Sequence, residues 1–81
     1  MDDYGDTPAA ASPVAVELLD HYDLADQPGR TLQALQVFFP GKAIEYFAAL
    51  QVGGVVRVDD PVFVDLVGQL AAQGFRVRLV G

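Results

Sequence analysis

Hydrophobic and polar positions in the last third of the chain follow the pattern of a strand, a helix and a second strand. Residues 55–58 form a short β-branched run, and residues 75–79 alternate between large apolar side chains and arginines. Both patterns are typical of strands. Between them, apolar residues recur at helical spacing, namely Phe63, Leu66, Val67, Leu70 and Ala71. We therefore predict a C-terminal β-α-β unit whose strands form a parallel pair with a right-handed crossover.

Local signals mark both ends of the predicted helix. Asp59-Asp60-Pro61 follows the first strand, and an Asp can cap free N–H groups while Pro fits the first helical position. Gly74 stands where a left-handed C-terminal cap is expected.

The first half of the chain predicts further helices. Ser12-Pro13 resembles a helix start, and the helix that follows would end before the turn at residues 27–29. Its apolar side would consist of Ala15, Leu18, Leu19 and Tyr22. Residues 42–50 predict another helix, with Ile44, Phe47 and Ala48 on its apolar side and Gly53-Gly54 closing it.

Residues 31–39 fit two interpretations. Leu32, Leu35 and Phe39 match a helical face, whereas the run 37–39 favours a strand by residue type; we favour the helix. The predicted fold class is then α+β, a small two-layer domain with helices packed on one face of a short sheet. The alternative is an α/β fold with a three-stranded βαβαβ sheet.

Composition suggests how the chain is organised. Residues 1–12 hold a single large aromatic residue, Tyr4, and predict a mobile acidic tail; residues 13–81 predict one domain. A hydrophobic content of 52% is high for 81 residues and predicts apolar surface buried against a second copy or another protein. No signal peptide or membrane-spanning run is visible, which predicts a cytoplasmic protein without membrane contact.

Charge is unevenly distributed along the chain. The net charge of −6 is the sum of −7 before Gln27 and +1 after it. The early acids are Asp2, Asp3, Asp6, Glu17, Asp20, Asp23 and Asp26. Such a balance argues against direct nucleic-acid binding, because phosphate contact needs a concentrated positive field.

The inventory of chemical groups argues against catalysis. The chain has no cysteine, one serine and one histidine, and the spacing of Ser12 and His21 does not bring them together as a nucleophile and its base. No cofactor is expected. Asp59 and Asp60 lie at a strand end, where two carboxylates could hold magnesium; the favoured interpretation is a helix cap with an arginine partner. Asp20, His21, Asp23 and Asp26 suggest weak metal binding or a pH-sensitive contact, or simply a solvated helix end.

Two groups of residues are candidates for partner binding. Arg57, Arg76 and Arg78 fall on one predicted sheet face, where they could meet acids of the N-terminal part or of a partner, or form an ordinary wet face. Phe38 and Phe39 are hard to bury together, so one of them could anchor an interface. With Asp20, Asp23 and Asp26 these make up the predicted partner-binding residues.

The leading functional hypothesis is a non-catalytic protein-binding module, an accessory or regulatory protein that acts as a homo-oligomer or within a complex. A second hypothesis is an acidic decoy that occupies the nucleic-acid-binding surface of another protein. A third is a small magnesium-dependent enzyme, or enzyme subunit, that uses Asp59 and Asp60.

Overall fold

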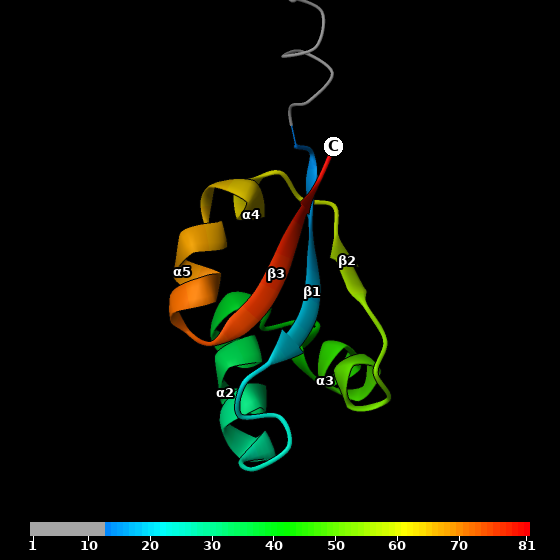
Figure 1. Ribbon diagram of the computed structural model, residues 1–81, viewed down its shortest axis with the longest axis vertical. Helices are drawn as coiled ribbons and strands as arrows, with labels where there is room; N and C mark the ends of the chain where they lie inside the picture. The colour runs from blue at the N-terminus through cyan, green and yellow to red at the C-terminus, as the bar shows by residue number, and fades with distance from the viewer. Residues whose placement is uncertain (1–12) are drawn as a thin grey trace, which may run out of the picture.

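The computed structural model describes residues 13–81, so the predicted acidic tail lies outside the described residues. This part of the chain forms three strands and four helices, with two helices between each strand and the next (Figure 1). In order they are β1 (Ala15–His21), α2 (Pro28–Phe38), α3 (Ala43–Gln51), β2 (Val56–Val58), α4 (Val62–Asp65), α5 (Val67–Ala72) and β3 (Phe75–Val80).

The three strands form one sheet in the order β2-β1-β3, with β1 antiparallel to both neighbours. Both predicted C-terminal strands are present. The prediction that they pair in parallel is wrong, because β1 lies between them and pairs with each. β2 and β3 run in the same direction only because both oppose β1.

The predicted helix after Pro13 is wrong, since this segment is the central strand β1. Val16 and Leu18 are fully buried, while Glu17 between them faces outward, so the period is that of a strand. The helical interpretation needed Tyr22 on the buried side, but 72% of Tyr22 is exposed. A register shift between Leu18 and Asp20 places both Leu18 and Leu19 in the strand and obscures its alternation.

The next two helices were predicted correctly in type. Residues 31–39 are helical up to Phe38, with Leu35 and Phe39 in the core. Helix α3 covers the predicted segment, but its buried side differs from the prediction. Ala43 and Leu50 are buried, whereas 72% of Ile44 is exposed.

The predicted C-terminal helix consists of two short helices. At Leu66 the N–H bonds to the carbonyl of Phe63, three residues back, which tightens the turn and separates α4 from α5. Gly74 adopts a φ of 98° after α5, as the C-terminal cap prediction requires.

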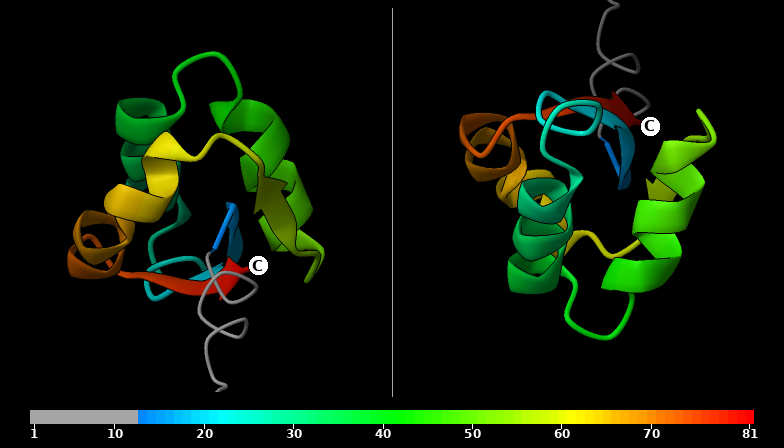
Figure 2. Two further views of the ribbon diagram at one scale, coloured as in Figure 1. Left: turned by 90° about the horizontal axis from the view of Figure 1, so that it is seen from above. Right: turned by 90° about the horizontal axis from the view of Figure 1, so that it is seen from below.

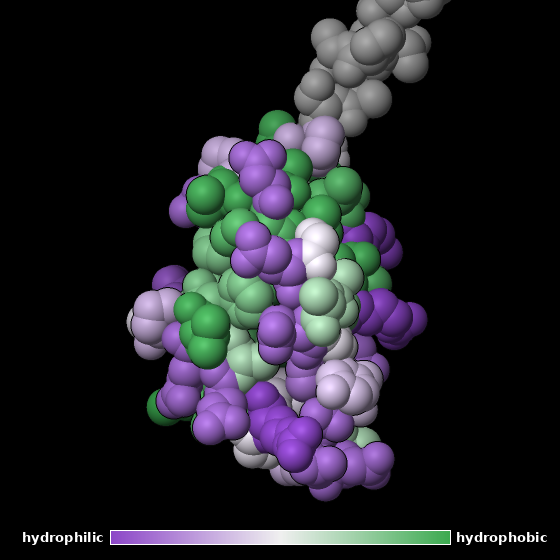
Figure 3. All heavy atoms as spheres, turned by 90° about the vertical axis from the view of Figure 1, so that its left-hand side faces the viewer, coloured by the Kyte–Doolittle hydropathy of each residue, from purple (hydrophilic) through white to green (hydrophobic). Residues whose placement is uncertain are grey.

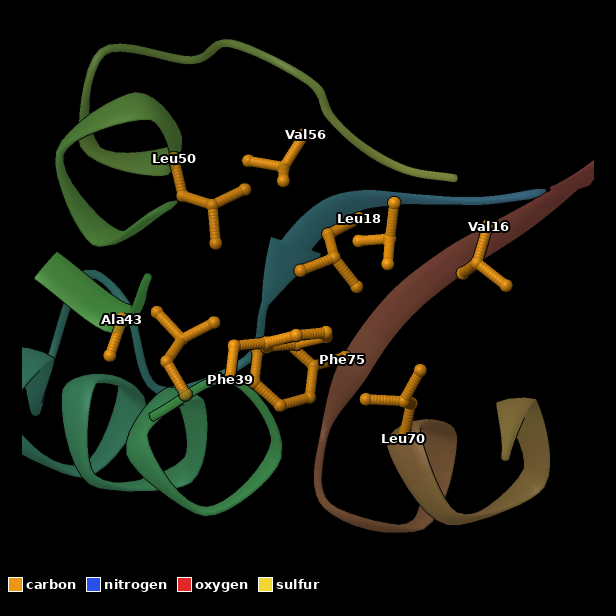
Figure 4. Close-up of a cluster of buried hydrophobic side chains, with 10 residues drawn as sticks. Val16, Leu18, Phe39, Ala43, Leu50, Val56, Leu70 and Phe75 are labelled. Atoms are coloured by element: carbon orange, nitrogen blue, oxygen red, sulfur yellow. The ribbon is translucent and has the colours of Figure 1, made fainter. Parts of the chain in front are cut away.

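All four helices lie on one side of the twisted sheet (Figure 2). Side chains from the helices and from the inner face of the sheet converge in a single apolar cluster (Figure 4). The predicted α+β class, with helices on one face of a short sheet, is therefore confirmed. Among the described helices, none combines the length and apolar character that crossing a bilayer requires.

Candidate interaction surfaces

A groove of about 370 Å³ lies between α2 and α5. It is lined by Ala34, Val37, Phe38, Gln69, Ala72 and Gln73, which we call the α2–α5 face. Val37 is 76% exposed beside the groove. Hydrophobic residues gather in the upper and central part of this side of the molecule, and hydrophilic residues dominate its lower end (Figure 3).

The α2–α5 face contains no charged residue. The sequence has no acidic or basic residue in residues 31–41 or in residues 66–75, and the fold places these two stretches on either side of one groove. The groove continues into a second hollow of about 490 Å³, where Asp23 and Arg30 supply charge at one end. The surface is thus apolar, edged by amides and charged only at its margin.

Phe38 and Phe39 are divided between this surface and the core. Phe39 is 6% exposed and packs against the rings of Tyr46 and Phe63, with centroids 5.1 and 4.7 Å away. Phe38 is half-buried, lines the groove and meets Phe75 edge-on at 6.2 Å. This division agrees with the expectation that only one of the two rings is buried in the core.

The predicted arginine face is also present, on the side of the sheet away from the helices. Glu17 on β1 stands between Arg57 on β2 and Arg78 on β3 in the strand register. The Nε atom of Arg78 donates to the Glu17 carboxylate at 2.8 Å, and its Nη2 atom makes a second bond there. Arg78 therefore meets an acid of the N-terminal part, one of the partners that we expected for the arginines, whereas Arg57 bonds to Asp59 beyond its own strand.

Asp59 and Asp60 serve structural contacts. The Nε atom of Arg57 donates to Asp59 at 2.6 Å, and this bond, together with the charge of Asp59, raises the pKa of Arg57. Asp60 accepts the N–H of Val62 at 3.1 Å, which caps the start of α4. Within residues 13–81, no group of three or more His, Cys, Asp or Glu residues is placed to hold a metal ion.

The acidic cluster does not lie at a helix end as predicted; it lies at the end of β1 and in the turn that follows. Asp26 is exposed, Asp20 is half-buried, and Asp23 is only 9% exposed. Asp20 accepts the N–H of His21 at 2.8 Å. The three carboxylates therefore differ too much in exposure to form one continuous acidic patch.

His21 is a buried structural residue, 3% exposed. Its Nε2 atom lies 2.8 Å from the carbonyl oxygen of Gln73, which can only accept, so Nε2 carries the proton. Its Nδ1 atom then accepts the Thr31 hydroxyl at 2.6 Å and the Asp23 N–H at 3.3 Å. Both ring nitrogens are occupied, which leaves no free position for a metal ion.

The α2–α5 face as a whole was not predicted from the sequence. The two uncharged stretches were readable, but they are distant in the sequence and no local pattern places them together. Comparisons with protein-family models, with curated proteins and with solved structures find no match to this chain. A functional proposal for this protein therefore depends on the residues of the chain alone.

Proposed function

We propose that this protein is a non-catalytic binding module that associates with a second copy of itself through the α2–α5 face. The observation that carries the proposal is the uncharged groove beside the exposed Val37. An exposed apolar surface rimmed by polar groups is typical of a protein interface.

Charge favours this surface for self-association. Each copy carries a net charge of −6, so two copies repel one another unless they meet through neutral surface. In a two-fold dimer a patch meets the same patch of the other copy, and any charge near the axis meets its like. The α2–α5 face avoids this repulsion.

The amide groups at the groove also suit a symmetric contact. Gln69 and Gln73 line its α5 side, and a glutamine side chain both donates and accepts hydrogen bonds. Glutamines of two copies can therefore bond to each other across a two-fold axis. Val37 and Phe38 would supply the apolar contact beside them.

The remaining groups fit a non-catalytic role. The single histidine is held by hydrogen bonds at both ring nitrogens, and the exposed arginine–carboxylate pairs satisfy one another. An accessory or regulatory protein that works by association needs no reactive group.

Light scattering on a sizing column, over a range of protein concentrations and at low and high salt, tests the proposal. We expect a dimer that persists at high salt, because the contact is apolar and uncharged. Val37→Glu and Val37→Lys should both yield a monomer, since either places a charge at the axis. A wild-type chain that stays monomeric at millimolar concentration would refute self-association.

Ile44→Glu is the matched control. Ile44 is 72% exposed, close to the 76% of Val37, and is also β-branched and helical, but it lies on α3 next to Glu45. We expect this variant to remain dimeric. If it dissociates as readily as the Val37 variants, the effect is one of net charge and not of the α2–α5 face.

A further inference from the structure

Strand β3 forms an open edge of the sheet. It is six residues long and pairs with β1 on one side only. An edge strand leaves about half of its backbone N–H and C=O groups without a strand partner. The opposite edge, β2, has only three residues, so β3 offers the longer template for another strand.

The outward side chains of β3 are positively charged and spaced two residues apart. Arg76 and Arg78 are both exposed. On the neighbouring strand β1, Asp20 lies opposite Arg76 and Glu17 lies opposite Arg78 in the register. In the register, β1 thus places a carboxylate residue opposite each of these arginines.

The charge of Arg76 is not satisfied by its register partner. Arg78 is hydrogen-bonded to Glu17, whereas Asp20 accepts the backbone N–H of His21. Among residues 13–81, neither a hydrogen bond nor an ion pair is made by the guanidinium of Arg76. Within the described part of the chain nothing occupies its donors, and a carboxylate on the outer side of β3 would lie within their reach.

We propose that the outer edge of β3 binds an extended segment of a partner protein that carries carboxylates at every second position. The partner strand would pair with β3 through backbone hydrogen bonds, which supply affinity, and place its carboxylates beside Arg76 and Arg78, which supply selectivity. The two-residue spacing follows from the alternation of side chains along a strand.

A second copy of β3 does not suit this edge. When two β3 strands pair antiparallel with their exposed faces on the same side, every register that pairs more than three residues places Arg76 or Arg78 opposite an arginine of the other copy. Like charges directly opposite are destabilising. The edge therefore favours a different, acidic strand, and this binding is independent of the proposed self-association through the α2–α5 face.

The probe is a short capped peptide that alternates glutamate with valine or threonine, added to the full-length isotope-labelled chain. We expect saturable amide shifts and slowed amide exchange confined to residues 75–80. The same peptide with lysine in place of glutamate should not bind. A peptide with proline at alternate valine positions keeps its charge but loses backbone donors, and it should also fail to bind.

Arg76→Glu tests the charge. The side chain is exposed, so circular dichroism should be unchanged, while peptide affinity falls by about fivefold to tenfold. Lys42→Glu makes the same charge change on an exposed residue outside the sheet and should bind nearly as well as the wild type. Absence of saturable shifts, equal binding of the lysine or proline peptide, or full affinity of Arg76→Glu would each overturn the proposal.

Tests on the Val37→Glu variant separate the two proposals. Loss of its dimer together with intact peptide binding would show two independent surfaces. Shifts that map to the α2–α5 face instead of β3 would overturn the strand-pairing proposal and leave self-association to be judged by the sizing experiment.

Discussion

The α2–α5 face and the outer face of the sheet expose opposite kinds of side chains to solvent. The α2–α5 face carries amides and apolar groups and no charge. On the outer sheet face, Arg57 and Arg78 are paired with carboxylates of the same chain, whereas Arg76 makes no such pair within residues 13–81. A surface whose charges are satisfied internally does not need a partner, whereas exposed apolar area gains from being covered. The difference indicates where association is expected first.

The sharpest test of this division is the pair of neighbouring phenylalanines. Phe39→Ala should lower the free energy of unfolding by about 3–5 kcal/mol, because it leaves a cavity between α2, α3 and α4. Phe38→Ala should cost clearly less, since its ring is only half-buried, yet it should weaken self-association. Chemical denaturation and light scattering measure the two effects. Equal losses of stability in the two variants would contradict the assignment of Phe39 to the core and of Phe38 to the α2–α5 face.

The Thr31 hydroxyl links α2, which carries one side of the α2–α5 face, to the central strand β1 through His21. Thr31→Val keeps the shape of the side chain but removes the 2.6 Å hydrogen bond to His21. Because the site is fully buried, we expect a loss of about 1–3 kcal/mol in the free energy of unfolding. Thermal denaturation measures this loss, and an unchanged mass in light scattering would confirm a purely structural role. If Thr31→Val left the free energy of unfolding unchanged, the Nδ1 atom of His21 would have to accept a hydrogen bond from another donor.

Two glycines near the α2–α5 face should respond in opposite directions. Gly74 has a φ of 98° and an added Cβ would meet the Tyr22 ring, so Gly74→Ala should destabilise the fold by about 1–2 kcal/mol. Gly68 lies within α5 with open space around it, so Gly68→Ala should stabilise it by about 0.5–1 kcal/mol. Urea denaturation of both variants checks the signs, and a gain for Gly74→Ala would contradict them.

The smallest effect is expected on the outer sheet face. Glu17→Gln removes the charge that faces Arg78, whose side chain is 59% exposed. Exposed pairs contribute about 0.2–1 kcal/mol, so the loss should not exceed this range and should shrink further in high salt. A double-mutant cycle with Arg78→Gln isolates the coupling. A coupling free energy well above this range would mean that the Glu17–Arg78 pair stabilises the fold more than an ordinary exposed pair does.

Much of the fold could be predicted from the sequence because its signals were local. The alternation in residues 75–79, the Asp-Pro helix start and Gly74 each fixed an element or its boundary within a few residues. The central strand could not be predicted, since the consecutive residues Leu18 and Leu19 interrupt the alternation of a strand and resemble a helical side. The register shift between Leu18 and Asp20 accommodates them in β1. With β1 assigned to a helix, the favoured sheet was a parallel pair of β2 and β3, and the three-stranded alternative needed a strand in residues 31–39, which are helical up to Phe38.

The candidate surfaces were predicted only in part, for a related reason. The spacing of the arginines on their strands placed them on one face, and their partner Glu17 became visible only with β1 in the centre. The α2–α5 face depends on two segments about thirty residues apart whose approach is decided by packing. The structure also shows that Phe39 is buried in the core while Phe38 is half-buried at the groove, a difference that the spacing of apolar residues in the sequence does not predict.

The hydrogen bonds of His21 have a consequence for how the molecule opens. The ring ties the end of β1 to α2 through Thr31 and to the turn before β3 through Gln73, so these segments cannot separate singly without stranding a buried polar group. They should exchange their amide protons as one cooperative unit. Among the described residues, α3 and β2 have no buried side-chain hydrogen bond of this kind, and we expect their amides to exchange earlier.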